Sequence, residues 1–245
     1  MHKPLAAVIL AAGKGTRMDS DLPKVLHEVG EKPMIVHVIH TARNLGAEIV
    51  ITVLGYKHEI VQKELENESV ECALQLKQLG TAHAVLQCQK LLTDFQGNVL
   101  ILYGDVPLTK VETLSRLMEI HEKEDAWSTI LTTDLPNPTG YGRIIRNKDN
   151  SLMKIVEEKD ATHEERAVHE INSGIYVFDA QILFRLLPAV GNNNRQNEYY
   201  LPDVLNLIIK EKGKVAIDKI NNYIEIQGVN NTVQLTAVNK LYENA

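Results

Sequence analysis

The most constraining feature of this sequence is an uninterrupted apolar run at residues 6–12 (AAVILAA), which stops at Gly13. A short apolar run that ends at glycine is typical of a strand buried on both faces, as in a parallel sheet. The 245 residues around it are 44% hydrophobic and 24% charged, which is enough for one sizeable core. The run therefore predicts an α/β fold with its first strand inside the sheet.

Helix and strand patterns alternate after this run. Pro33 opens a segment at 34–45 with apolar residues at helical spacing, and Gly46 follows it as a C-cap. We expect further strands at 49–54, 70–74 and 99–103 and further helices at 57–66, 82–92 and 109–123, the last starting with a capping box from Thr109 to Glu112. This order predicts a Rossmann-like, doubly wound, mostly parallel (mixed) sheet, with ligands beyond the carboxyl ends of its strands.

The pattern changes in the second half of the chain, where shorter strands alternate with polar loops. We expect strands at 143–146, 152–157 and 174–178 and late helices at 201–212 and 232–243. The whole chain, 1–245, is expected to be a single domain. Within it we expect a first part at about 1–135, an inserted lobe at about 136–228 and a C-terminal helix at 229–245.

Charge and hydropathy exclude several classes of protein. The 26 Lys and Arg residues against 32 Asp and Glu residues give a net charge of −6, which does not favour binding to nucleic acid or to an anionic membrane. No apolar run reaches the length of about 18 residues that a membrane span requires. The start of the chain does not have the pattern of a signal peptide, and Cys72 and Cys88 form no CxxC pair, so we expect a cytoplasmic protein without a zinc site.

The glycine loop after the first strand has the composition of an anion site. Gly13 and Gly15 let backbone N–H groups approach a phosphate, and Arg17 and Lys24 add positive charge nearby. The loop is not a Walker A motif, and Met18 stands where the dinucleotide fingerprint needs a third glycine. A tight turn with solvated basic side chains is the alternative interpretation.

Two other positions carry a chemical and a structural interpretation. Asp105 follows the strand at 99–103, where its carboxylate could face a metal-bound phosphate or simply cap a turn. Gly80 and Thr81 precede a helix, where a glycine backbone could read a base or where Thr81 could serve as the N-cap.

The motifs together resemble those of the sugar-phosphate nucleotidyltransferases. The family pattern LxxGxGxRM, followed by PK, is matched by Leu10, Gly13, Gly15, Arg17, Met18, Pro23 and Lys24. Further matching motifs lie at 75, 78–83, 103–107, 140–143, 156–160, 170–174, 198–200 and 228–231. Pro202 departs from the threonine that is common in the family. Within the family, the similarity is greatest to bacterial members that act on UTP and N-acetylglucosamine 1-phosphate.

The resemblance implies a Mg²⁺-dependent uridyltransferase that forms UDP-N-acetylglucosamine and pyrophosphate, as in cell-wall and lipopolysaccharide precursor synthesis. It implies that Arg17 and Lys24 are catalytic and that Asp105 and Asn230 hold Mg²⁺. The implied nucleotide site, in the part at about 1–135, comprises Leu10, Ala11, Ala12, Gly13, Lys24, Gln75, Gly80 and Thr81. The implied sugar site, mainly in the lobe, comprises Tyr103, Gly104, Asp105, Gly142, Glu157, Lys159, Asn172, Glu198 and Tyr199.

Other functions remain open at this point. The chain could act on another sugar 1-phosphate or on CTP, or it could be a non-catalytic nucleotide-sugar sensor. No hexapeptide repeat of the kind that forms an acetyltransferase domain in many family members is present, so we expect neither that activity nor its trimer, but a monomer or at most a weak dimer. Whether the sequence is a stand-alone enzyme or a piece of a longer one is not decided by these patterns.

Overall fold

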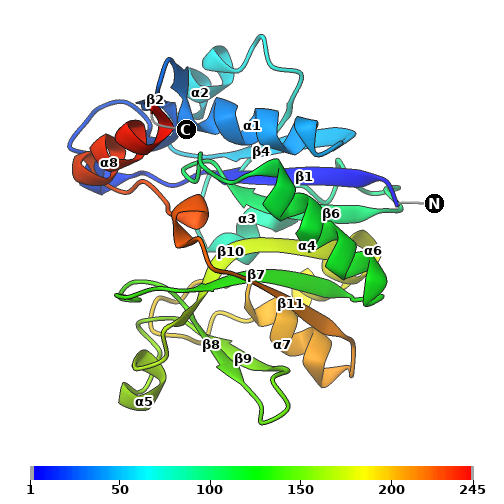
Figure 1. Ribbon diagram of the computed structural model, residues 1–245. Coiled ribbons are helices and arrows are strands. Elements are labelled where there is room, and N and C mark those ends of the chain that lie inside the picture. The colour runs from blue at the N-terminus through cyan, green and yellow to red at the C-terminus, as the bar shows by residue number, and fades with distance from the viewer. Residues whose placement is uncertain (1–2, 244–245) are drawn as a thin grey trace.

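A mixed sheet forms the centre of the computed structural model, which describes residues 3–243 (Figure 1). Its main path runs β11-β7-β10-β6-β1-β4-β5. The bounds of these strands are Leu5–Ala11 (β1), Ile49–Leu54 (β4), Glu71–Leu74 (β5), Asn98–Tyr103 (β6), Ser128–Asp134 (β7), Glu170–Asp179 (β10) and Val215–Ile220 (β11). Neighbours along this path are parallel except at β10, which is antiparallel to β6 and β7. The predicted α/β class with a mostly parallel, mixed sheet is confirmed.

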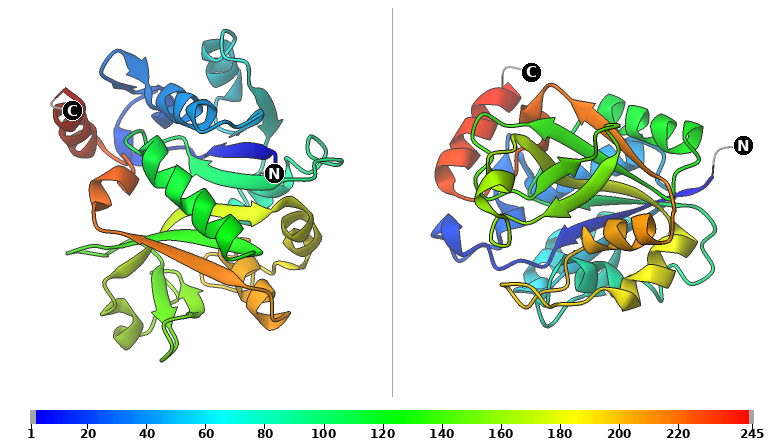
Figure 2. Two further views of the ribbon diagram at one scale, coloured as in Figure 1. Left: turned by 45° about the vertical axis from the view of Figure 1, so that its right-hand side comes forward. Right: turned by 90° about the horizontal axis from the view of Figure 1, so that it is seen from below.

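Helices cover both faces of the sheet (Figure 2). One face carries α1 (Met34–Asn44), α2 (His58–Glu64) and α4 (Val111–Lys123), and the other carries α3 (Thr81–Leu86), α6 (Ala180–Leu186) and α7 (Asp203–Lys210). Alternate residues of β1 belong to opposite cores, with Ala7 and Ile9 on the α1 side and Val8 and Leu10 on the α3 side. This double burial explains why the run at 6–12 contains no polar residue.

Smaller elements complete the fold. They are η1 (Thr16–Met18), η2 (Lys24–Leu26), the hairpin of β2 (Glu28–Val29) and β3 (Lys32–Pro33), β8 (Arg143–Arg146), β9 (Leu152–Val156), α5 (His163–Arg166), η3 (Leu187–Ala189), η4 (Tyr223–Ile226) and α8 (Thr232–Glu243). The terminal helix α8 lies at the end of the sheet opposite the N-terminus (Figure 1). Strands β8 and β9 extend the sheet from β10.

Several predicted elements differ from the structure. Strands β7 and β11 and helices α5 and α6 were not predicted, and β10 begins at Glu170 rather than at 174. The predicted capping box at Thr109 is wrong, because α4 begins at Val111 without a side-chain cap and the Thr109 hydroxyl donates instead to the Glu225 carbonyl at 3.0 Å. Residues 136–228 form both β8 and β9 and the central strand β10, so the sheet and the lobe share this part of the chain. No helix within residues 3–243 is long and apolar enough to cross a bilayer.

Candidate active site

Two adjoining cavities open beyond the carboxyl ends of β1 and β6. The first, which we call the loop cavity, has a volume of about 380 Å³ and is lined by the glycine loop, Gln75 and the start of α3. The second, which we call the lobe cavity, has a volume of about 340 Å³ and is lined by Gly142, Glu157 and Asn172. Tyr103, Asp105 and Asn230 line both cavities. A ligand that spans the two cavities would therefore pass over these residues.

Lys24 occupies the junction of the two cavities. Its Nζ donates to Asp105 Oδ2 and, at 3.2 Å, to Asn230 Oδ1. Arg17 Nη2 donates to the same amide oxygen at 3.0 Å. The side chains of Lys24 and Asp105 are only 16% and 13% exposed, so water screens this charge pair weakly. We refer to Arg17, Lys24, Asp105 and Asn230 as the junction cluster.

Backbone contacts hold the junction cluster in place. Asp105 follows β6, and its carbonyl accepts from Val229 N at 2.9 Å, which brings Asn230 to the end of that strand. Gly15 has a φ of +61°, and a Cβ atom there would lie 2.6 Å from Lys24 Cβ. Only glycine allows the loop to cross Lys24 this closely. The glycine loop therefore positions Lys24 as well as leaving Gly13 open to the cavity.

The oxygens of Asp105 and Asn230 suit a divalent cation. Both face a single cationic atom, Lys24 Nζ, so the two oxygens already converge on one point. A carboxylate with an amide oxygen is a donor set that Mg²⁺ accepts when phosphates and water supply the other ligands. Within residues 3–243 no cluster of three or more His, Cys, Asp or Glu residues could hold a metal by itself. A cation here would therefore bind together with a phosphate ligand.

All eight residues of the predicted nucleotide site line the loop cavity: Leu10, Ala11, Ala12, Gly13, Lys24, Gln75, Gly80 and Thr81. Gln75 is 3% exposed, and its Nε2 donates to the Gly80 carbonyl at 2.9 Å. Thr81 is not the predicted N-cap, because Gly80 holds that position. The Thr81 hydroxyl instead accepts from Leu201 N at 2.9 Å, which ties α3 to the loop before α7.

The lobe cavity brings together a carboxylate, an amide and a glycine. A Cβ atom on Gly142 would lie 2.9 Å from Glu157 Oε1, so the glycine leaves room for this carboxylate. Asn172 Oδ1 accepts from Tyr176 Oη at 2.8 Å and from Gly174 N at 2.9 Å. Burial, together with the nearby Asp203 and Asp160, raises the pKa of Glu157 to about 7. Burial also raises the pKa of Tyr103, which keeps its phenol neutral between the two cavities.

Four residues of the predicted sugar site lie elsewhere. Gly104 packs between β1 and η2, near Ala11 and Val25, and Lys159 is exposed outside both cavities. Glu198 lines the loop cavity rather than the lobe cavity. Tyr199 lines a separate apolar cavity beside α3.

Three residues that the sequence did not single out also contribute to the site. Tyr141 lines the lobe cavity, and Gln234 Oε1 accepts from Asn230 N at 2.7 Å. His83 contacts Gln75 from behind the loop cavity. The sequence offers a signal for His83, which ends the motif at 78–83, and for Tyr141, which lies within the motif at 140–143; Gln234 depends on long-range packing.

Comparisons with known proteins agree with this geometry. Residues 6–223 match the Nucleotidyl transferase family. The chain is 50% identical over 239 residues to Bifunctional protein GlmU of Alkaliphilus metalliredigens, covering 98% of this chain and 52% of the relative. It is 48% identical over 230 residues to Bifunctional protein GlmU of Bacillus subtilis, covering 94% of this chain and 50% of the relative. The chain thus spans about half the length of these curated relatives.

Solved structures share the fold at lower identity. A UDP-glucose pyrophosphorylase complexed with UDP-glucose superposes with a TM-score of 0.75 at 20% identity, covering 100% of both chains. A putative glucose-1-phosphate thymidylyltransferase from Bacillus anthracis gives a TM-score of 0.77 at 18% identity, covering 98% of this chain and 96% of the other. The family match extends over most of the chain and the curated relatives cover nearly all of it. The chain therefore belongs to the nucleotidyl transferase family.

Proposed function

We propose that the chain transfers a uridylyl group from UTP to N-acetylglucosamine 1-phosphate, forming UDP-N-acetylglucosamine and pyrophosphate. The observation that carries this proposal is the junction cluster, which lies where the loop cavity and the lobe cavity meet. A group-transfer enzyme needs two substrate sites that share one reacting point. The nucleotide would occupy the loop cavity and the sugar phosphate the lobe cavity.

The loop cavity suits a nucleoside triphosphate. A Cβ atom placed on Gly13 would have no neighbour within 4 Å, so the space beside this residue is open to a phosphate. At the other end of the cavity, the Gln75 side chain and the Gly80 backbone supply polar groups that could form hydrogen bonds with the edge of a base. Lys24 lies between the two ends and would meet the α-phosphate.

The lobe cavity suits a sugar with several hydroxyl groups. An ionised Glu157 accepts two or more hydrogen bonds, and Asn172 adds an amide. Asn172 Oδ1 already accepts hydrogen bonds from Tyr176 and Gly174. The Nδ2 group of Asn172 would therefore donate to a sugar oxygen or to the acetamido carbonyl. The curated relatives, rather than these contacts alone, favour N-acetylglucosamine among the possible sugars.

The reaction needs no general base in the chain. A phosphate monoester has a second pKa of about 6, so the attacking oxygen is already deprotonated at neutral pH. The barrier is repulsion between two anions as the sugar phosphate approaches the α-phosphorus in line with the departing pyrophosphate. Lys24 and Arg17, which both contact Asn230, would neutralise that charge at the junction.

Enzymes of this family generally use a divalent metal ion. We propose that the ion is Mg²⁺ and that Asp105 and Asn230 hold it, since their oxygens converge on one point. When bound, the ion would stabilise negative charge on the transferred phosphate and the leaving pyrophosphate. Lys24 would then be free to turn from Asp105 towards phosphate oxygens.

We also propose a monomer in the cytoplasm. The residues that we expect to contact the nucleotide, the sugar and the reacting phosphates lie together within one copy of the chain, which supports a site that a monomer can form. Cys72 and Cys88 are free thiols, as a reducing compartment favours. A single species of about 27.5 kDa in light scattering is the expected result.

The test is an assay that crosses UTP, CTP and dTTP with N-acetylglucosamine, glucose and glucosamine 1-phosphates, with pyrophosphate release as the readout. We expect the highest kcat/KM for UTP with N-acetylglucosamine 1-phosphate. Lys24→Ala should lower kcat by roughly 10²-fold or more, whereas Lys159→Ala, outside both cavities, should not. Binding of the nucleotide sugar without turnover by any pair would contradict an enzyme and support a sensor.

A further inference from the structure

We propose that His83 is a positioning residue that makes the loop cavity select a base carrying an N–H at the middle of its edge, as uracil does. It acts by fixing the orientation of the Gln75 amide. The inference rests on the proposed function, because it assumes that the loop cavity holds the base of the nucleotide. It adds a reason for the choice of UTP over CTP.

The Gln75 amide is held from two sides. Its Nε2 lies 2.9 Å from the Gly80 carbonyl oxygen and 2.9 Å from His83 Nδ1. A primary amide has two N–H groups, so both are used inside the protein. Gln75 lines the loop cavity, and among residues 3–243 no side chain or backbone group donates to its remaining polar atom, Oε1. Gln75 can therefore offer a ligand only an acceptor.

His83 takes part as a neutral acceptor. Burial lowers the pKa of its imidazole, which favours the uncharged ring. A neutral imidazole accepts on one nitrogen only. Nδ1 has the closer amide nitrogen, at 2.9 Å, whereas Nε2 lies 3.3 Å from Gln87 Nε2. The Gly80 carbonyl fixes Gln75 Nε2 as a donor, so Nδ1, which faces the second N–H of that amide, is the acceptor and the ring proton is on Nε2. Gln87 Nε2 donates instead to the His83 carbonyl at 2.8 Å.

A fixed acceptor distinguishes uracil from cytosine. The N3 atom of uracil carries a hydrogen and can donate to Gln75 Oε1. The N3 atom of cytosine is an acceptor, so its lone pair would face the lone pairs of Gln75 Oε1 and repel them. If the amide could rotate, it would present Nε2 to cytosine at little cost. The Gly80 carbonyl and His83 Nδ1 oppose this rotation, because each would lose its donor and face an oxygen.

The experiment measures kcat/KM for UTP and for CTP in wild type, His83→Asn and His83→Leu. Asparagine carries Oδ1 at nearly the place of Nδ1 and retains the acceptor, whereas leucine removes it. Leucine should be tolerated, because His83 also lines an apolar cavity with Leu79 and Leu86. We expect the UTP:CTP ratio to fall about tenfold or more in His83→Leu and to stay within about threefold of wild type in His83→Asn.

Gln87→Leu is the matched control, since Gln87 approaches the opposite nitrogen of the same ring. Its UTP:CTP ratio should equal that of wild type. An equal loss for both nucleotides in His83→Leu would overturn the inference while leaving uridylyl transfer intact, because it would show a purely structural role. A wild-type enzyme that prefers CTP would overturn it as well. Absence of turnover with any nucleotide would instead contradict the proposed function, and UTP and CTP affinities measured by calorimetry would then test the same ratio directly.

Discussion

Glu157 is a carboxyl group of the candidate site whose pKa is shifted by its buried environment. Burial is the main cause that raises its pKa to about 7, well above the usual range of a glutamate carboxyl. The ionised form acts only as an acceptor, on both oxygens, whereas the protonated form carries an O–H donor on one of them. The affinity for the sugar phosphate should therefore depend on pH near neutrality.

We expect KM for the sugar phosphate to fall as pH rises from 6 to 8 in wild type, since deprotonation of Glu157 creates the acceptor. The substrate phosphate also ionises in this range. Glu157→Gln separates the two effects, because the variant retains only the titration of the substrate. Identical pH profiles for wild type and Glu157→Gln, from initial rates at saturating UTP, would contradict a sugar contact by this carboxylate.

The same residue should affect stability with a definite sign. Its pKa is higher in the folded chain than in the unfolded chain, so the folded state binds more protons between about pH 4.5 and 7. Unfolding free energy contributed by this group therefore decreases as pH rises through that window. At pH 8, Glu157→Gln should be more stable than wild type by on the order of 2 kcal/mol, with little difference at pH 4.5. Urea titrations at the two pH values measure this; greater stability of wild type at pH 8 would contradict it.

Individual residues could be predicted from the sequence where the chemistry was local. The cations of the glycine loop and Asp105 at the end of a strand fall into this group, and the structure brings them together. The role of Thr81 could not be predicted, because its partner, Leu201 N, lies 120 residues along the chain. The structural requirement for glycine at position 80 could not be predicted either, because it comes from close contact with the backbone of Tyr199.

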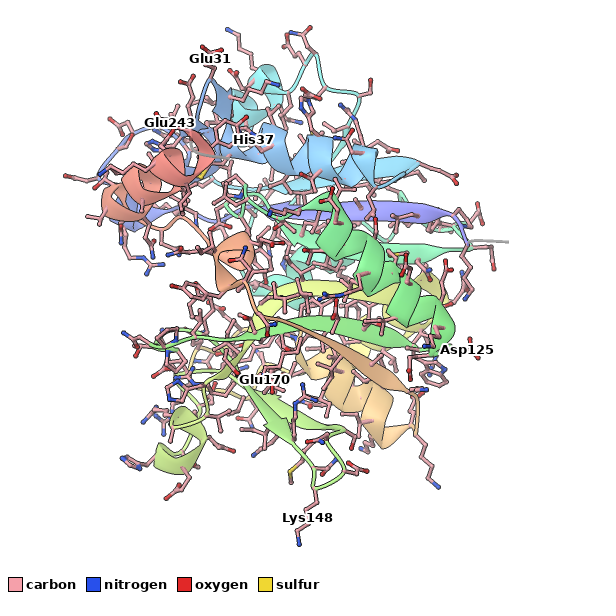
Figure 3. The ribbon with its side chains drawn as sticks, viewed as in Figure 1. Glu31, His37, Asp125, Lys148, Glu170 and Glu243 are labelled. Carbon is pink, nitrogen blue, oxygen red and sulfur yellow. The ribbon has the colours of Figure 1, made fainter. Side chains whose placement is uncertain are left out.

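At the scale of elements, strands were predictable when burial made them apolar on both faces. β7 (STILTTD) and β11 (VAIDKI) instead carry polar residues that depend on tertiary partners. Thr133 donates to the Ile220 carbonyl at 2.8 Å, and Asp218 pairs with Arg116 at 2.9 Å. The start of β10 likewise contains buried Glu170, labelled in Figure 3, which pairs with Arg146. Such partners leave no periodic signal in the sequence.

The start of α3 depends on Gly80 for a structural reason. Its φ is +113°, and a Cβ atom would lie 2.4 Å from the Tyr199 carbonyl oxygen. The glycine therefore permits the pairing in which Ala82 N donates to that carbonyl at 2.9 Å. A larger residue would collide with backbone there rather than fill the loop cavity.

We accordingly expect Gly80→Ala to lower the unfolding free energy by about 1–3 kcal/mol, measured by urea denaturation. Gly13→Ala is the control, since a Cβ there meets nothing within 4 Å and its φ is not positive. The control should be within about 0.5 kcal/mol of wild type. A Gly80→Ala protein of unchanged stability would show that α3 can move away from residue 199.

Helix α8 fixes the last member of the junction cluster. It begins at Thr232, just after Asn230, and Asn239 ties it to the β2–β3 hairpin by accepting from Gly30 N at 2.9 Å and donating to the Glu28 carbonyl at 3.2 Å. Figure 3 shows the end of α8, at Glu243, near His37 of α1, and the rings of Tyr242 and His37 are 5.1 Å apart.

We expect Asn239→Ala to lower kcat several-fold and to reduce hydrogen-exchange protection over residues 228–243, because α8 would no longer hold Asn230 firmly. KM for the sugar phosphate should change less, since Glu157 and Asn172 do not contact this helix. Val233→Ala, at a side chain that is 77% exposed on the same helix, is the control and should behave as wild type. Normal kcat with lost protection would show that Asn230 does not depend on α8.

At the scale of the whole molecule, the fold assembles the junction from segments that are remote in sequence. Arg17 and Asn230 are 213 residues apart, and Lys24 and Asp105 are 81 apart. The topology of parallel strands predicted that Asp105 and the glycine loop would share an edge. Asn230 was predicted only through the family motif at 228–231, because its place beside Asp105 follows from the long return of the chain after β11.

This assembly gives the sharpest test of the proposed metal site. Asp105→Ala and Asn230→Ala should each lower kcat, by roughly 10²-fold or more for the charged ligand, and each should require more Mg²⁺ for half-maximal rate. The double variant should be little worse than Asp105→Ala, because both residues would act through one ion. Rates across a Mg²⁺ titration and calorimetric binding of Mg²⁺ with UTP provide independent readouts.

Lys24 offers a competing explanation for such coupling, because it contacts both residues directly. If Lys24 alone coupled them, the non-additivity would not vary with Mg²⁺ concentration, and it would vanish in a Lys24→Ala background. If a shared ion couples them, the single variants should approach the wild-type rate as Mg²⁺ increases, and the coupling should persist without Lys24. Strictly additive losses at every Mg²⁺ concentration would show that Asp105 and Asn230 share neither partner during the reaction, and would remove the metal from this junction.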